Sequence, residues 1–328
     1  MNIYVDAMGG DNAPQAIVEG SVDAVKEYGI SLTLVGKQTA IEKELEKYTV
    51  PEGAIRIINA DSVIGFDEEP VMAIRKKTDS SLVVALEAMK HQEDAVLISA
   101  GSTGAIMAGG LFKLGRIKGI KRPALAVAIP KGDKASILID AGANADCKAE
   151  YLPQFGLLGT IYCESVMGME NPSVGIVNIG TEEEKGSMMV KEAHQLLKES
   201  GLNFVGNVEA RDIPTTKADI LVTDGFTGNV ILKLIEGLAS YLMSGIKTAI
   251  MGSTKGKIGG ALIKGDLRNF KKAFSSDEVG GAPFLGVRGG LIKAHGSSNA
   301  FAIKNAIRQA IRFSEGDVVG KITRALQD

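Results

Sequence analysis

The chain has 328 residues, 45% of them apolar, and a formal net charge of -2, so it can fill one large α/β core or two smaller ones. This near balance of charge excludes a general attraction to nucleic acid, and no continuous run of 18 apolar residues of the kind that spans a bilayer is present. Two cysteines and no charged leader followed by an apolar stretch predict a protein of the reducing cytoplasm.

Short aliphatic or β-branched runs alternate with longer amphipathic stretches along the chain. The runs expected to be strands are 2–5, 31–36, 54–60, 95–99, 125–129, 136–140, 173–179, 203–208 and 219–223. The stretches with helical periodicity include 14–28, 80–91, 148–168, 186–200 and 298–313. This alternation is typical of βαβ units, so we predict a three-layer α/β/α catalytic domain over residues 1–328, built on a mostly parallel sheet.

Four apolar runs lead directly into turns of small and polar residues. The turns are 100–105 (AGSTGA), 140–144 (DAGAN), 223–229 (TDGFTGN) and 295–300 (HGSSNA). Since ligands of open parallel sheets bind beyond the carboxyl ends of the strands, we expect all four turns at that edge. Glycine makes up 40 of the 328 residues, against a usual share of about 7%, and at such turns it lets the backbone approach a ligand closely.

Three of these turns open a predicted helix without an acidic residue in the first turn, which leaves unpaired N–H groups and the positive end of the helix dipole to an anion. In the first of them, Ser102 and Thr103 supply hydroxyls and Gly104 removes bulk. By contrast, Thr181 and Glu184 predict a capping box that fills its own helix start. No G-x-G-x-x-G follows the first strand, and no P-loop is present. We therefore predict a shared site for inorganic phosphate or a small phosphorylated molecule.

The titratable and thiol side chains give no sign of a metal site. His91, His194 and His295 are scattered, and no spacing of His, Cys or carboxylates resembles a ligand set, so we expect neither a metal nor another cofactor. His295 lies at a strand end, where a functional role and a structural hydrogen bond are both open. Cys147 has no base beside it in the sequence and is expected to be an inert thiol.

A serine nucleophile is an alternative to a phosphate site. Ser102, Asp224 and His295 follow one another in the Ser, Asp, His order of the α/β-hydrolases, and AGSTG approaches their nucleophile elbow. The first glycine of that elbow is replaced by Ala100, and no HGGG-type segment lies upstream. A Ser-His-Asp acyl hydrolase or transferase therefore stays as an alternative that lacks two parts of the motif.

One stretch differs in character from the rest. Residues 245–273 contain seven Lys or Arg and a single acid, Asp266, and their pattern predicts a basic amphipathic helical hairpin that projects from the sheet. Its apolar face, rimmed by lysine, suits shallow burial at an anionic membrane surface, packing between subunits, or docking of an acidic carrier protein. The residues expected to make that contact are Ile258, Leu262, Ile263, Lys271 and Lys272.

Several longer strings resemble one family. They are VDAMGGDNAP (5–14), RKKTDSSL (75–82), SAGSTGA (99–105), DAGAN (140–144), NIGTEEEKG (178–186), VTDGFTGNV (222–230), GGAPFLGVRGG (280–290) and HGSS (295–298). From residue 3 to about 313 the sequence is similar to the bacterial phosphate acyltransferases of phospholipid synthesis, the PlsX family, with Phe284 where leucine is expected. The resemblance implies transfer of an acyl group from acyl-[acyl-carrier-protein] to inorganic phosphate. It also implies a homodimer, a fold like that of isocitrate dehydrogenases and phosphotransacetylases, and loose attachment to the membrane near the downstream glycerol-phosphate acyltransferase.

In that reaction phosphate is itself the nucleophile and a thiolate leaves, so positioning and oxyanion stabilisation matter more than an activated side chain. The residues assigned to phosphate or substrate are Ser102, Thr103, Gly104, Asn144, Lys233, Ser297, Ser298 and Arg75. The residues assigned to catalysis are His295 and Asn229 as oxyanion donors, Asp224 as an orienting group and Lys185 as a countercharge.

Three other functions stay open. A phosphotransacetylase-like enzyme that uses acyl-CoA would differ only in the thiol carrier. A dehydrogenase is the alternative at the level of the fold, although its dinucleotide motif is missing. A regulator that binds phosphate or a lipid precursor would bind without turnover.

Overall fold

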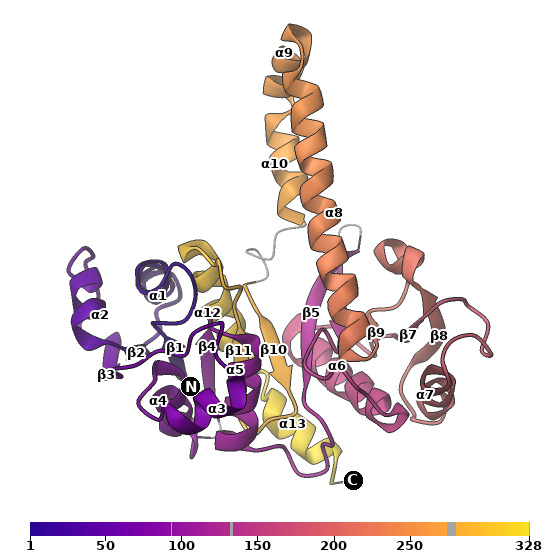
Figure 1. Ribbon diagram of the computed structural model, residues 1–328, viewed down its shortest axis with the longest axis horizontal. Coiled ribbons are helices and arrows are strands. Elements are labelled where there is room, and N and C mark those ends of the chain that lie inside the picture. Colours follow the sequence, from indigo (N-terminus) through magenta and orange to yellow (C-terminus); the bar gives the residue numbers. More distant parts are fainter. Residues whose placement is uncertain (93, 132–133, 274–279, 328) are drawn as a thin grey trace.

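Figure 1 shows the computed structural model, which describes residues 1–92, 94–131, 134–273 and 280–327, without the side chains of 268, 269 and 271–273. Within these residues eleven strands form one continuous sheet in the order β3-β2-β1-β4-β11-β10-β5-β6-β9-β7-β8. The strands are β1 (Asn2–Asp6), β2 (Leu32–Gly36), β3 (Ile55–Asn59), β4 (Ala95–Ser99), β5 (Ala124–Lys131), β6 (Lys134–Ile139), β7 (Val174–Asn178), β8 (Phe204–Glu209), β9 (Ile220–Val222), β10 (Ala282–Leu285) and β11 (Gly290–Lys293). Three of the pairings between strands are antiparallel and the others are parallel, so the predicted mostly parallel sheet is confirmed.

Each of the five predicted amphipathic stretches corresponds to a helix whose ends lie within four residues of the predicted ones. The helices of the described residues are α1 (Gln15–Tyr28), α2 (Gln38–Leu45), α3 (Pro70–Lys76), α4 (Ser81–Met89), α5 (Thr103–Gly109), α6 (Leu152–Met167), α7 (Met188–Lys198), α8 (Gly225–Met251), α9 (Thr254–Leu262), α10 (Lys264–Ala273), α12 (Ala300–Glu315) and α13 (Val318–Ala325). Three shorter helical turns are η1 (Gly110–Leu114), η2 (Ala149–Tyr151) and η3 (Ala210–Thr215).

The direction of the strands reverses in the middle of the sheet. β11 pairs antiparallel with β10, β10 with β5, and β5 with β6, so β4 and β11 run opposite to β6 and β9. The expectation that all four small-residue turns lie at one edge is therefore wrong. The turns after β4 and β11 leave the sheet in one direction, and the turns after β6 and β9 leave it in the opposite direction. Side-chain alternation predicts which residues are strands, but it carries no information about which neighbour each strand chooses.

Side chains on the two faces of the sheet build two separate cores, which gives the predicted three layers. On one face, alternate residues such as Ile3 and Val5 pack with α1, α6, α7, α12 and α13. On the other face, Tyr4 and Leu97 pack with α3, α4, α5 and α8, which lie toward the viewer in Figure 1. Since successive residues of a strand point to opposite faces, each buried strand contributes to both cores.

The capping box predicted from Thr181 and Glu184 is wrong. α7 starts only after these residues, and Ser187 caps it by accepting a hydrogen bond from the backbone N–H of Val190 at 3.3 Å. Gly186, with φ of 96°, adopts a left-handed conformation that does not continue a helix. The acidic run therefore lies in the loop between β7 and α7.

The helices α8, α9 and α10 form an arm that rises from the sheet (Figure 1). The predicted hairpin is present, but its ascending helix is continuous from Gly225, so the hairpin starts inside α8 and not at residue 245. The backbone of Lys271 and Lys272 belongs to α10. The side chains of these two lysines lie outside the described part of the structure, so their predicted contacts stay predictions.

By length and composition alone, α8 is long and apolar enough to cross a membrane, the one such helix among the described residues. This differs from the sequence-based expectation, because the average hydropathy of a window can be high although charged residues interrupt it. Phe226, Leu234 and Tyr241 are exposed on one side of α8. On its other side Leu232 and Ile235 pack against the core of the sheet, so the apolar surface of this helix has two different uses.

Candidate active site

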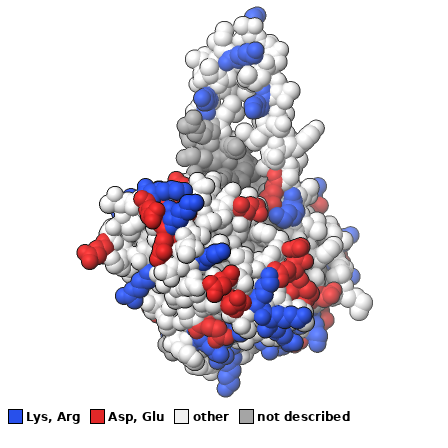
Figure 2. Space-filling view, turned by 60° about the vertical axis from the view of Figure 1, so that its left-hand side comes forward, with Lys and Arg blue, Asp and Glu red and all other residues white. Residues whose placement is uncertain are grey.

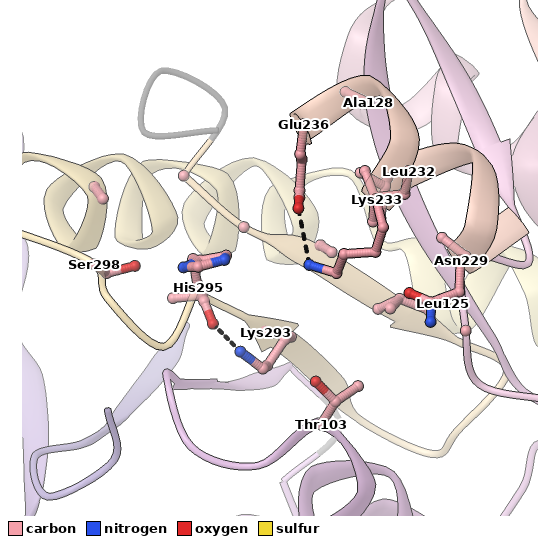
Figure 3. Close-up of a pocket in the computed structure, with 18 residues that line it drawn as sticks. Thr103, Leu125, Ala128, Asn229, Leu232, Lys233, Glu236, Lys293, His295 and Ser298 are labelled. Carbon is pink, nitrogen blue, oxygen red and sulfur yellow. Dashed lines mark hydrogen bonds and ion pairs between the residues drawn. The ribbon is translucent and has the colours of Figure 1, made fainter. Parts of the chain in front are cut away.

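A cavity of about 290 Å³ opens over β5 and β10, between α5 and α8 (Figure 3). Its polar side chains are Thr103, Asn229, Lys233, Glu236, Lys293, His295 and Ser298. Its larger apolar side chains are Leu125, Val127 and Leu232. The cavity therefore brings together residues from all three acid-free turns, although these turns leave opposite edges of the sheet.

Lys293 lines the cavity from the last residue of β11. Leu291, two positions earlier on the same face, belongs to the buried core, so an apolar residue would be the usual choice at 293. The pKa of the Lys293 ammonium is lowered to about 8, mainly because the group is buried. The nearby charge of Lys233 lowers this pKa further, and the charge of Asp11 acts in the opposite direction. Its Nζ donates a hydrogen bond to the carbonyl of Ala294, and no carboxylate in the described ranges forms an ion pair with it. An anion that entered the cavity would find this cation available.

Ser298 contributes a buried hydroxyl to the cavity. The residue is 3% exposed, and its Oγ has no hydrogen-bond partner within the part of the chain that the structure describes. An unsatisfied buried hydroxyl costs about 1–3 kcal/mol, so such groups are usually paired or serve a ligand. The turn that carries it is held from the loop after β1, because Asn12 Nδ2 donates to the carbonyls of Ser297 at 3.1 Å and Ser298 at 3.2 Å. The first-strand motif thus has a structural role in fixing this turn.

The hydrogen bonds of His295 select one form of its ring. The backbone N–H of Ser297 donates to Nδ1 at 3.3 Å, and the Ser297 hydroxyl lies 2.8 Å from the same atom. Because Nδ1 accepts the backbone N–H, the neutral imidazole carries its proton on Nε2 and can donate from there. In Figure 3 the ring lies between Ser298 and Lys293.

Successive turns of α8 present polar groups to the cavity. Asn229, Lys233 and Glu236 lie at helical spacing on one face, and Lys233 Nζ pairs with Glu236 at 2.8 Å. Asp224 caps the helix, because its carboxylate accepts from the backbone N–H of Thr227 at 2.8 Å and from the Thr227 hydroxyl at 2.7 Å. Asp224 therefore positions the helix and does not line the cavity.

Asp140 organises the turn after β6. Its carboxylate accepts backbone N–H bonds from Leu125 at 3.0 Å, Ala143 at 2.9 Å and Asn144 at 2.7 Å. Burial raises the pKa of Asp140, and these donors oppose that rise. The side-chain amide of Asn144 donates to Asp140 at 2.9 Å and to the carbonyl of Pro123 at 2.7 Å. Asn144 is thus committed to these bonds, so the geometry gives its side chain an orienting role and does not support its assignment to phosphate.

Two predicted charged residues are not brought to the cavity. Lys185 lies in the exposed loop before α7, where its carbonyl accepts a hydrogen bond from Asn178 Nδ2 at 3.0 Å. The guanidinium carbon of Arg75 on α3 lies 5.1 Å from the ring centroid of Phe112. Neither side chain lines the cavity, so their assignments as a countercharge and a phosphate ligand have no support from the geometry.

Three residues assigned to phosphate border the cavity without lining it. Ser102 caps α5, with its Oγ accepting from the backbone N–H of Ala105 at 3.5 Å. Gly104 packs against α3, since a Cβ at this position would lie 2.7 Å from Pro70 Cγ. Ser297 supports His295, as its hydrogen bonds show.

The Ser, Asp, His alternative loses its geometric basis. Ser102, Asp224 and His295 are all described, and each makes its side-chain hydrogen bonds within its own turn. No hydrogen bond joins any two of these three side chains, whereas a triad needs two such bonds in sequence.

The thiols offer no nucleophile. Burial raises the pKa of Cys147 to about 11 and that of Cys163 to about 12, so both are protonated near neutral pH, which supports the predicted inert role of Cys147. No group of three or more His, Cys, Asp or Glu side chains that could hold a metal ion is found in the described ranges.

Lys293 is a functional candidate that belongs to none of the recognisable turns of the sequence. Its signal was a lysine inside the apolar run GGLIKA, between the fully buried Ile292 and Ala294. A lysine at an inward-facing strand position is rarely placed there for packing. The pairing of β11 with β4 and β10 then carries it into the same cavity as Thr103 and α8.

Solved structures of other proteins share the fold. The EutD phosphotransacetylase from Staphylococcus aureus matches 97% of this chain and 93% of its own, with a TM-score of 0.59 at 16% identity. A phosphotransacetylase from Streptococcus pyogenes matches 95% and 94%, with a TM-score of 0.60 at 16% identity. A 4-hydroxythreonine-4-phosphate dehydrogenase from Klebsiella pneumoniae matches 96% and 99%, with a TM-score of 0.56 at 11% identity. At these identities the likeness concerns the fold, and it confirms the expected phosphotransacetylase-like architecture.

Sequence relatives are much closer. A family model described as "Fatty acid synthesis protein" matches residues 1–321. A protein from Alkaliphilus oremlandii named phosphate acyltransferase is 53% identical over 99% of this chain and 97% of its own. Phosphate acyltransferases from Clostridium botulinum (Loch Maree) and Clostridium acetobutylicum are 55% and 51% identical, over 94% and 100% of this chain and 93% and 99% of their own. With more than half of its residues shared over nearly its full length, the chain belongs to the PlsX family of phosphate acyltransferases, enzymes that transfer an acyl group to phosphate.

Proposed function

We propose that the enzyme takes a fatty acyl group from acyl-[acyl-carrier-protein] and that inorganic phosphate attacks the thioester directly, giving acyl phosphate for phospholipid synthesis. The observation that carries this proposal is a single cavity in which, among the described residues, Lys293 has no carboxylate partner and the Ser298 hydroxyl has no hydrogen-bond partner. The candidate nucleophiles are unsuited to an acyl-enzyme, because Ser102 serves as a helix cap and Cys147 is a protonated thiol.

Phosphate binds between β11, α12 and α8 in this proposal. Lys293 supplies the principal cation, and the Ser298 hydroxyl donates to a phosphate oxygen. The N-terminal turn of α12, which contains no acid, adds favourable dipole potential. Lys233 adds a second, weaker charge, because Glu236 already neutralises part of it.

The reaction then needs one attack and one departure. A phosphate oxygen forms a bond to the carbonyl carbon, the carbonyl electrons move to oxygen, and the C–S bond breaks as the oxyanion collapses. The thiolate leaves and takes up a proton from solvent. His295, through Nε2–H, and the side-chain amide of Asn229 stabilise the oxyanion, a task for preorganised donors in a partly closed site.

The test of this function compares two thioesters, a hexadecanoyl carrier protein and hexadecanoyl-CoA, with and without phosphate. We expect phosphate-dependent loss of the carrier thioester, with acyl phosphate trapped by hydroxylamine, and a smaller rate with acyl-CoA. Mass spectrometry of enzyme mixed with the carrier thioester and no phosphate should show unmodified protein. A stable acyl adduct on Ser102 would overturn the direct mechanism, and preference for CoA would favour a phosphotransacetylase-like activity.

The proposal includes peripheral attachment of a cytoplasmic enzyme to an anionic membrane surface, near the membrane acyltransferase that consumes acyl phosphate. At the end of the arm, Ile258 is 62% exposed and Leu262 is 82% exposed on one face of α9. Lys255 and Lys257 flank them, and Figure 2 shows basic but no acidic side chains on the visible end of the arm. Apolar burial and attraction to anionic headgroups add together at such a surface.

Replacing Leu262 and Ile263 by glutamate should lower the fraction of enzyme that floats with anionic liposomes, because both apolar contact and charge attraction are lost. Activity on a soluble thioester and the mass in solution should stay unchanged. Glutamate at Ile179 and Met188, which are 77% and 89% exposed elsewhere on the protein, is the matched control. Loss of activity or of the native mass in the arm variant would show that this face packs within the assembly, and the membrane proposal would be withdrawn.

The proposal also includes a homodimer that uses the free side of α8. Large apolar side chains follow one another there at spacings of three or four residues, so they form one stripe along the helix. The stripe consists of Phe226, Val230, Leu234, Leu238 and Tyr241, each more than half exposed. A stripe of this length on a soluble protein favours a protein partner, and a second copy of the chain would bring an identical stripe.

A further inference from the structure

The segment between η1 and β5 carries a concentration of positive charge that the proposed chemistry does not use. From Lys113 to Arg122 the sequence reads KLGRIKGIKR, with five basic residues and no acid, in a protein whose formal net charge is -2. Lys113 pairs with Glu87 at 2.9 Å. In the part of the chain that the structure describes, Lys118 and Arg122 form no ion pair, so they contribute uncompensated charge at the surface.

This segment borders a groove of about 570 Å³, which we name the basic groove. It is lined by Leu111, Phe112, Arg116, Lys121, Arg122, Glu150 and Tyr151. Phe112 is 51% exposed, and the guanidinium of Arg75 lies over its ring at 5.1 Å from the centroid. Lys121 pairs with Glu150, and Arg116 donates to the carbonyl of Lys121. The groove therefore combines an exposed aromatic ring with a surplus of cations.

Two elements connect the basic groove with the cavity. Arg122 lines the groove and Leu125 lines the cavity. The two residues are three positions apart, which corresponds to about 10 Å of extended chain. Thr103, which also lines the cavity, precedes Phe112 by nine residues along α5 and the π-helical turn η1, so the two lie at most about 13 Å apart along the helix axis at the α-helical rise of 1.5 Å per residue. In Figure 1 the chain after α5 passes along the lower edge of the molecule before it rises into β5. A thioester carried on a partner's flexible tether could therefore reach the cavity when that partner binds at the lower edge.

We propose that the basic groove is the docking surface for the acidic acyl carrier protein, and that the acyl-bearing tether of the carrier protein enters the cavity between α5 and β5. This inference rests on the proposed donor. Charge complementarity selects the occupant, because a carrier protein is acidic and the segment from Lys113 to Arg122 contains no acid to repel it. Docking at this edge also leaves the arm of α8 to α10 free for other contacts.

The experiment measures the KM for hexadecanoyl carrier protein in the double variant Lys118→Glu, Arg122→Glu. Neither side chain forms an ion pair in the described structure, so folding should be preserved. At low salt we expect KM to rise by about tenfold or more, with a weaker salt dependence than the wild type, since rim charges act mainly on association. The KM for phosphate and the rate with hexadecanoyl-CoA at saturation should be unchanged, which also shows that the variant is folded.

Two further variants carry the same change in net charge. Lys191→Glu with Lys217→Glu alters exposed lysines elsewhere on the body and should leave the carrier KM unchanged. Lys255→Glu with Lys257→Glu tests the arm as the dock. An unchanged carrier KM in the groove variant, or a rise confined to the arm variant, would overturn the inference. Failure of the proposed function is distinguishable, because the wild type would then release no acyl phosphate from the carrier thioester.

Discussion

Replacing Lys293 by methionine should raise the KM for phosphate by roughly 10- to 100-fold, because a hydrogen bond to a charged group contributes about 1.5–3 kcal/mol. Methionine keeps the volume and the unbranched shape of the side chain and removes only the charge and its donors. The KM for the acyl thioester should change little. Initial rates at varied phosphate, with the thioester held at saturation, measure the effect.

The pH dependence separates a binding role of Lys293 from a structural one. Its pKa is lowered to about 8, so the cation is lost as pH rises through that value, and the KM for phosphate should rise above pH 8 in the wild type. The folded state binds fewer protons than the unfolded state between about pH 8 and the usual lysine pKa of about 10.4, so stability should increase with pH across that window. The methionine variant should lose both dependences. A phosphate KM that is unchanged by the substitution would remove Lys293 from the site.

The fold could be predicted to the extent that it depends on local patterns. Runs such as 95–99 and 136–140 became β4 and β6 because apolar residues on both faces of a strand are the signature of a sheet covered by helices. β10 was not predicted, since four residues that include Pro283 and lie between glycines give little local signal. The reversal of strand direction depends on β10, which pairs with residues more than 150 positions away. No local pattern encodes that choice.

The site could be predicted only for residues that belong to recognisable turns. Thr103, Asn229 and Ser298 were found because each follows an apolar strand, and the cavity contains all three. Lys293 was missed because its importance arises from the approach of β11 to α8, two elements that are separated by the whole arm in the sequence. Lys185 was included because its motif is specific, but the left-handed Gly186 keeps that loop separate from the helix start it was expected to form.

Replacing His295 by alanine should lower kcat by about 100-fold, the scale typical of losing one oxyanion donor, and should change the KM for phosphate less. The reason is geometric: the backbone N–H of Ser297 donates to Nδ1 at 3.3 Å, which leaves Nε2–H as the donor of a ring that lines the cavity. Since the oxyanion exists only after phosphate has attacked, losing its donor affects the transition state and spares the bound ground state. Steady-state kinetics with both substrates varied provide the measurement.

Two variants control for this result. Ser297→Ala removes the hydroxyl 2.8 Å from Nδ1 but keeps the backbone N–H, so it should preserve the tautomer and cost much less than His295→Ala. Cys147→Ser should leave kcat nearly unchanged, because a thiol with a pKa of about 11 takes no part in the attack. A near wild-type kcat for His295→Ala would transfer the oxyanion role to Asn229 alone. An inactive Cys147→Ser enzyme that still folds would instead require a covalent intermediate, and direct attack by phosphate would have to be abandoned.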